Sequence, residues 1–252
     1  MQRFYVLNIK HFRRWAVVVI FALFTSLFIW FEHDGFLSVF SQDDPSALAR
    51  GNANETNIAL TFNISWGDEK VHGILEQLEQ EDIQATFFVS GEWAERHPEI
   101  VEDITEANHE LGMLGYRYKS YLDQDIEEVK KDLLKAKEVF RKLEYDDINL
   151  LRAPSGHFNK DIIEMAERLE LKSIHWNVHP HDWKNPGTDI IVDHVMKETE
   201  NGDIILLHAS DSVKQTEKAL SVILPGLKNK GFTFVSISEL INQANSEAKL
   251  IE

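Results

Sequence analysis

The alternation of short apolar segments with helical patterns constrains the fold of this 252-residue chain more than any other feature. Residues 126–143 repeat apolar side chains at helical spacing, with Glu–Lys pairs on the polar side. Such repeated alternation implies parallel strands joined by right-handed crossovers, so we predict an α/β fold. A closed or distorted barrel and a doubly wound sheet both fit this pattern. The segments with strand composition are residues 58–64, 85–90, 109–115, 148–154, 172–179, 203–209 and 233–237.

The amino-terminal region contains an uncharged apolar run, WAVVVIFALFTSLFIWF, over residues 15–31. Its length is at the short end of what crosses a bilayer as a helix. Two arginines precede the run, whereas Glu32 and Asp34 follow it, so the positive-inside rule places the amino terminus inside the cell. A cleaved signal peptide is the alternative. We favour an uncleaved anchor because the nearest small-x-small motif, at 47–49, lies far beyond the run.

These features predict a single-pass protein of the cell membrane with most of its chain outside. The polar, glycine- and asparagine-containing sequence that follows the run is typical of a flexible stalk. The predicted regions are a basic cytoplasmic tail (1–14), a transmembrane signal anchor (15–31), a stalk (32–56), a globular domain (57–243) and a polar carboxyl-terminal tail (244–252).

Composition restricts the partners of the domain. The chain has no cysteine, which excludes disulfides and thiolate metal sites. The formal net charge is −16, and the first 14 residues contribute four cations and no acid. A body this acidic repels phosphate backbones, so we expect no nucleic-acid partner, and anionic wall polymers are disfavoured for the same reason. Neutral or amino-bearing glycans remain compatible with this charge.

Several polar residues follow directly after predicted strands: Asn63, residues 152–157, residues 179–183 and His208. The carboxyl ends of parallel strands share one face of barrels and open α/β sheets, where active sites are built. We therefore expect these distant segments to meet. Loops are polar in any protein, however, so a single residue among them carries little weight alone.

Six segments of the chain together carry a family resemblance: TFNISWGDE, ATFFVSGEWAERHPE, NHELGMLGYRYKSY, LLRAPSGHFNK, WNVHPHDWKNPG and GDIILLHAS. Through them the chain over about residues 57–241 resembles the NodB-homology polysaccharide deacetylases, carbohydrate esterase family 4, and most of all their membrane-anchored, PdaB-type sporulation members. That resemblance implies a distorted (β/α) barrel of about seven parallel strands and hydrolysis of N-acetyl groups on glycans.

The resemblance implies a divalent metal such as zinc, held by one Asp and two His, with a second Asp as general base. Asn63 occupies the base position here, and a neutral amide cannot accept a proton near pH 7. Ile64 occupies the position of the metal-binding Asp, while Leu114 and Tyr118 replace the two His. We therefore expect no metal at this corner of the site.

Other motifs of the family are retained. By resemblance, Arg152 orients the base and His208 is the general acid for the leaving amine. His179 replaces an Asp that would pair with Arg152. The remaining matches predict substrate-binding positions at Pro154, Gly156, Asp182, Trp183 and Leu206.

Two functional hypotheses follow from this mixture of lost and retained residues. The first is a catalytically impaired member that binds N-acetylated cell-wall or spore glycan, or an unknown protein partner. The second is an active amidohydrolase with a non-standard site. His175, His179 and His208 could form such a metal site, although packed or surface imidazoles are the simpler explanation. A serine nucleophile has no supporting motif.

Overall fold

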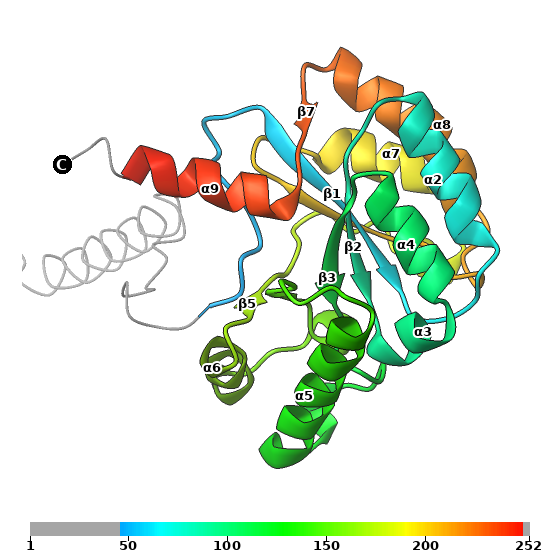
Figure 1. Ribbon diagram of the computed structural model, residues 1–252. Helices are drawn as coiled ribbons and strands as arrows, with labels where there is room; N and C mark the ends of the chain where they lie inside the picture. Colours follow the sequence, from blue (N-terminus) through cyan, green and yellow to red (C-terminus); the bar gives the residue numbers. More distant parts are fainter. Residues whose placement is uncertain (1–45, 249–252) are drawn as a thin grey trace, which may run out of the picture. The chain divides into compact units, whose positions relative to one another are not determined.

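The computed structural model describes the backbone of residues 46–248 and side chains as far as residue 243 (Figure 1). The predicted tail (1–14) and anchor (15–31) lie outside the described residues, as does most of the predicted stalk. Among residues 46–248, no helix combines the length and the apolar composition that a bilayer span requires.

Seven strands form one parallel sheet, which confirms the predicted α/β class, and one strand overlaps each of the seven predicted segments. The strand order is β5-β4-β3-β2-β1-β6, and β7 pairs with the start of β1. The strands are β1 (Asn57–Ile64), β2 (Thr86–Val89), β3 (Glu110–Met113), β4 (Leu150–Leu151), β5 (Lys172–Ser173), β6 (Ile204–His208) and β7 (Thr233–Phe234).

Helices connect the strands and cover the outer side of the sheet (Figure 1). The segment predicted as helical at residues 126–143 forms α5, whose buried side chains recur at the predicted spacing. The helices are α2 (Lys70–Gln80), α3 (Gly91–Arg96), α4 (Pro98–Glu106), α5 (Ile126–Lys142), α6 (Lys160–Arg168), α7 (Thr188–Glu198), α8 (Thr216–Asn229) and α9 (Ile237–Ala248), with single 3₁₀ turns η1 (Tyr121–Asp123), η2 (Pro154–Gly156) and η3 (Asp182–Lys184).

The sheet has two apolar faces, because residues along each strand alternate between them. The larger cluster lies between the outer face and helices such as α2, α5 and α8, and it includes Ile64. The smaller cluster fills the concave inner side, where Phe88 and Leu114 pack together with residues of other strands. Helix α9 contributes Ile237 and Leu240 to this inner cluster, so α9 closes the end of the barrel opposite the strand carboxyl ends.

The barrel is incomplete between β5 and β6. Two isolated parallel bridges span part of the opening, from Leu48 to Ile174 and from Val178 to Ile205. The ladder of β5 therefore ends at Ser173, earlier than the predicted strand 172–179, and the chain beyond it becomes irregular. This irregular stretch contains the histidines of the candidate site.

The part of the predicted stalk that the structure describes, residues 46–56, is bound to the domain. The N–H of Leu48 donates to the Ser173 carbonyl at 2.8 Å. Arg50 forms an ion pair with the buried carboxylate of Asp203 at 2.6 Å. These contacts fix this segment beside the sheet opening, so the packed region starts before the predicted boundary.

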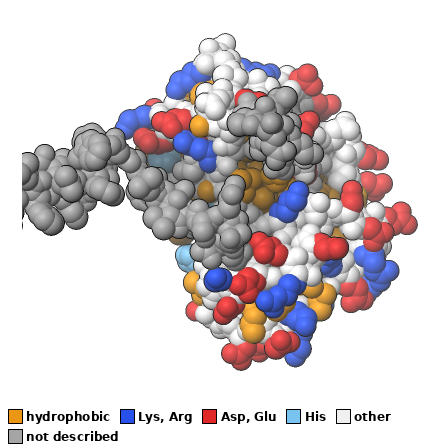
Figure 2. Space-filling view, turned by 90° about the vertical axis from the view of Figure 1, so that its left-hand side faces the viewer, with side chains coloured by type: hydrophobic (Ala, Val, Ile, Leu, Met, Phe, Trp, Pro, Cys, Tyr) orange, Lys and Arg blue, Asp and Glu red, His pale blue; other side chains and the backbone are white. Residues whose placement is uncertain are grey.

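Register brings the ends of three neighbouring strands together. Asn63 in β1 lies beside Phe88 in β2 and beside His208 in β6. These pairs place Asn63 and His208 at one rim of the sheet, as expected for the carboxyl ends of parallel strands. On the face shown in Figure 2, acidic and basic side chains are interspersed and no continuous basic patch is seen.

Candidate functional site

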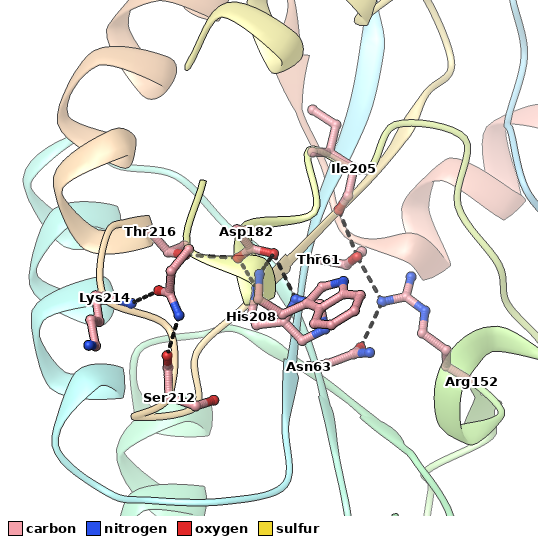
Figure 3. Close-up of polar contacts among 11 residues, drawn as sticks. Thr61, Asn63, Arg152, Asp182, Ile205, His208, Ser212, Lys214 and Thr216 are labelled. Atoms are coloured by element: carbon pink, nitrogen blue, oxygen red, sulfur yellow. Dashed lines mark hydrogen bonds and ion pairs between the residues drawn. The ribbon is translucent and has the colours of Figure 1, made fainter. Parts of the chain in front are cut away.

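Arg152 lies at the rim, beside Thr61 and Asn63, and donates to several partners (Figure 3). Its Nη1 donates to the Thr61 hydroxyl at 2.9 Å and to Asn63 Oδ1 at 3.1 Å. Its Nη2 donates to the carbonyl of His175 at 3.1 Å, and the guanidinium lies 4.0 Å above the ring of Phe88. Arg152 therefore links β1 to the irregular chain after β5.

The positive charge of Arg152 is buried without a carboxylate. Its side chain is fully buried, and no ion pair reaches it within residues 46–243. Its Nε has no hydrogen-bond partner among these residues. Burial lowers the pKa of the Arg152 guanidinium to about 9, which still leaves it charged at neutral pH. A buried cation whose hydrogen-bond partners are a hydroxyl, an amide and a carbonyl, all of them neutral, is costly to retain.

The three positions where the resemblance places metal ligands do not fit a metal. Ile64 and Leu114 are fully buried in apolar clusters, and neither has a donor atom. Tyr118 is 43% exposed, and its hydroxyl lies near Asn63 and Ser155. Burial raises the pKa of this hydroxyl above its usual value of 10, so the phenolate required for ligation is not available near pH 7.

Asp182 and His208 form a densely hydrogen-bonded unit of the site (Figure 3). Asp182 Oδ1 is 2.8 Å from His208 Nδ1 and accepts the Trp183 N–H at 3.0 Å. Its Oδ2 accepts the His208 N–H at 2.7 Å and the Thr216 hydroxyl at 2.8 Å. The buried carboxylate thus favours the tautomer with the proton on Nδ1, which leaves Nε2 of His208 able to exchange a proton with a ligand.

His179 also reaches this unit, whereas His175 does not. The His179 and His208 rings are 5.8 Å apart, and His179 Nε2 is buried without a hydrogen bond among the described residues. Burial, assisted by the neighbouring imidazoles, lowers the pKa of His179 to about 4. His175 instead stacks on Trp176 at 4.1 Å and contacts its carbonyl.

The structure therefore changes the membership of the alternative metal site. Within the described residues, His179, Asp182 and His208 each offer a potential ligand atom within 4.8 Å of the others. Both oxygens of Asp182 already accept two hydrogen bonds, so it is better placed to orient His208 than to ligate.

The turn after β4 is closely packed on an aromatic ring. Ser155 adopts a positive φ of 62°, and Gly156 follows with a φ of 72°. A Cβ on Gly156 would lie 2.1 Å from the ring of Trp176, so only glycine fits without a shift. Pro154 begins this turn and is buried with it. The predicted positions 154 and 156 thus shape the rim through the backbone.

Of the remaining predicted substrate-binding positions, Leu206 is buried and Trp183 is exposed. Leu206 is buried in β6 beside Thr61, so it forms part of the floor of the rim. Trp183 is 49% exposed, and the Lys184 ammonium lies 5.1 Å from the centre of its ring. An exposed indole beside a polar site is suited to packing against a ligand.

Sequence reasoning missed three residues that position this site: Thr61, Trp176 and Thr216. Thr61 could have been found, because it precedes Asn63 by two residues and so shares its face of β1. Thr216 begins α8, and no local signal linked it to Asp182. The ring of Trp176 meets Gly156 only through the fold.

The comparisons with known proteins agree with this architecture. The polysaccharide deacetylase family pattern matches residues 50–174. A peptidoglycan-N-acetylglucosamine deacetylase from Bacillus cereus is 35% identical over 191 residues, covering 75% of this chain and 89% of the relative. The crystal structure of a CE4 family pseudoenzyme from Bacillus anthracis is 30% identical, with a TM-score of 0.73 over 78% of this chain and 69% of that chain.

A mutant of the same pseudoenzyme, described as having restored enzymatic activity, matches about as well, with a TM-score of 0.74 and 30% identity over 78% of this chain and 71% of that chain. Similarity therefore extends to peptidoglycan deacetylases and to a pseudoenzyme of one fold. Together with the parallel sheet and the rim residues described above, these matches show that the chain belongs to the NodB-homology (CE4) polysaccharide deacetylase family.

Proposed function

We propose that this protein is a catalytically impaired polysaccharide deacetylase that binds N-acetylated cell-wall glycan at its degenerate site. The contact between the buried guanidinium of Arg152 and the neutral amide of Asn63 carries the proposal. At this position a deacetylase requires a group that accepts a proton from water. An amide that already accepts a hydrogen bond from a cation cannot do so.

The surroundings of Asn63 support the same conclusion. Ile64 and Leu114 present buried hydrocarbon where the family resemblance places metal ligands. Without a cation to polarise the acetamide carbonyl and to lower the pKa of water, neither the electrophile nor the nucleophile of the hydrolysis is activated. His208 retains a potential proton donor, but an acid alone supplies only one of the required functions.

Binding needs fewer of these groups than catalysis does. An N-acetyl group can pack its methyl against apolar walls such as Leu206, and its sugar ring can lie on the exposed indole of Trp183. Burial of this kind contributes on the order of 1–2 kcal/mol. His208 Nε2 can hydrogen-bond a hydroxyl or carbonyl of the ligand. The rim can therefore hold a glycan that it does not cleave.

Acetate release and metal content test the proposal together. The full-length chain, purified in detergent, should release no acetate from N-acetylglucosamine oligomers or peptidoglycan, with or without added zinc. Chelator-sensitive acetate release would instead support the alternative, an amidohydrolase with a non-standard site. His179→Ala then locates the metal, because it removes a potential ligand of the His179–Asp182–His208 group without altering residue 64.

Membrane anchoring through residues 15–31, with the domain outside the cell, is part of the same proposal. It is supported by the uncharged run and by the arginines that precede it. Protease added to intact cells should digest the domain. Protection of the domain in intact cells, combined with digestion after lysis, would contradict this orientation.

A further inference from the structure

A groove of about 340 Å³ lies beside the degenerate site, between the loop after β1 and helix α3. This volume is at the lower end of the range for small-ligand sites. Trp66 lies at the edge of the groove and is 65% exposed, the largest exposed fraction among the large hydrophobic side chains of residues 46–243. None of the roles assigned above to the rim uses this side chain.

The loop that carries Trp66 is held rigidly. The carboxylate of Asp211 accepts hydrogen bonds from the N–H groups of Asp68, Glu69 and Lys70, at 2.8 to 3.1 Å, and so caps the start of α2. From the other side, the indole N–H of Trp93 donates to the Gly67 carbonyl. An exposed tryptophan on an immobilised loop loses little further backbone entropy when a ligand binds.

Polar groups around the groove complement this indole. The Asp68 side chain has no hydrogen-bond or ion-pair partner among the described residues, so its carboxylate remains available as an acceptor. Across the groove, Arg96 and Glu92 form an ion pair at 2.6 Å. The pair holds the guanidinium N–H donors of Arg96 and the carboxylate acceptor of Glu92 at the side of the groove formed by α3. A flat apolar platform combined with exposed acceptors and donors matches a pyranose ring, which has an apolar face and a rim of hydroxyls.

We propose that this groove is a second subsite for the same glycan, with one sugar ring on Trp66 and its hydroxyls bound by Asp68. The inference rests on the proposed glycan-binding function. Trp66 follows Asn63 by three residues, so the two backbone positions are at most about 11 Å apart. A short oligosaccharide can therefore occupy the rim and the groove together, and a small concave groove favours a sugar ring over a protein surface.

The test is a calorimetric titration of the full-length chain in detergent with N-acetylglucosamine oligomers of two to six units. The variants are Trp66→Ala, Asp68→Asn, Trp183→Ala and, as a control, Ile190→Ala, which removes another exposed apolar side chain from α7. Unfolding temperatures of all variants establish that the fold is intact.

We expect Trp66→Ala to weaken binding of the longer oligomers about tenfold and to leave the disaccharide unchanged. Asp68→Asn should weaken the longer oligomers less, and Ile190→Ala should have no effect. Equal affinities of the wild type and Trp66→Ala at every chain length, with binding still lost in Trp183→Ala, would overturn the second subsite and leave the proposed function intact. Absence of binding to the wild type at every length would overturn both.

Discussion

Replacing Asn63 by Asp should stabilise the protein without making it an enzyme. Asn63 is 4% exposed, and its Oδ1 lies 3.1 Å from Arg152 Nη1. Asp is nearly isosteric with Asn. The substitution therefore adds a negative charge beside the buried Arg152, which has no carboxylate partner among the described residues. It leaves Ile64 in place, and thus supplies no metal ligand at residue 64.

The magnitude follows from two opposing effects. Charges about 4 Å apart attract by about 4 kcal/mol at an effective dielectric constant of about 20. Burying the new carboxylate removes part of this gain, since desolvation of an ion costs up to several kcal/mol. The balance should raise the free energy of unfolding by about 1–3 kcal/mol at pH 7. For a domain of this size, each kcal/mol raises the unfolding temperature by about 2–4 °C.

The pH dependence identifies the cause. Arg152 should hold the pKa of the carboxyl introduced by Asn63→Asp below the unfolded value of about 3.9. The contribution of this carboxyl to stability is then fully present above that pH and is lost as the pH falls through the lower, folded pKa. Urea unfolding of wild type and variant between about pH 3 and pH 7 measures this. A variant less stable than the wild type at pH 7, or a gain that persists in acid, would refute the reasoning.

Asn63→Leu provides the matched control. It removes the acceptor that residue 63 offers to Arg152 and should lower the free energy of unfolding by about 1–3 kcal/mol at all pH values in this range. Acetate release is measured in parallel. If Asn63→Asp alone produced deacetylation, the argument that a metal is missing would be wrong.

Three further predictions address the rim and the core. Gly156→Ala should lower the free energy of unfolding by about 1–3 kcal/mol in urea titrations, because Gly156 has a positive φ and a Cβ there would overlap Trp176. Burial lowers the pKa of His109 to about 4, below its unfolded value of about 6.5. The neutral, buried His109 therefore contributes up to about 3 kcal/mol to the free energy of unfolding above pH 6.5, and this contribution is lost as the pH falls towards 4. Unfolding of His109→Asn should accordingly depend less on pH in that window. Calorimetry should detect zinc binding, and assays should detect weak deacetylation, only after all four family residues are restored by Asn63→Asp, Ile64→Asp, Leu114→His and Tyr118→His.

The strands can be located from the sequence because burial on both faces makes them continuous apolar runs. Every residue of β1 from Ile58 to Ile64 is buried, and this pattern identifies the segment as a strand. The end of β5 cannot be located in this way. Its continuation is set by Leu48, which bonds to Ser173 and His175 from a segment distant in the sequence. A local pattern contains no information about such a partner.

The site is predictable in position and less so in its contacts. Parallel strands carry their carboxyl ends to one rim, which brings Asn63, Arg152 and His208 together as expected. Side-chain direction is harder to predict. The period of two assigns His175 and His179 to one strand face, but the irregular chain after Ser173 separates them. Period-two reasoning fails wherever the backbone leaves the strand conformation.

The proposed loss of the metal would leave the charge of the site unchanged in one part and altered in another. If Asn63 and Ile64 each stand where the family has an Asp, as the resemblance implies, two negative charges are absent together with the two positive charges of a divalent metal, and that exchange is neutral. If His179 likewise stands for an Asp, no positive charge is lost with it, which accounts for a buried Arg152 without a carboxylate partner among the described residues.

Arg152 nevertheless has a structural role that does not depend on catalysis. Its guanidinium joins Thr61 in β1 to the His175 carbonyl beyond β5 and covers the ring of Phe88. Those bonds cross the interior near the point where the barrel is open, so removing the side chain would leave buried acceptors on both sides without a donor. Arg152 therefore stabilises the rim through its contacts with neutral groups, although its charge has no carboxylate partner among the described residues.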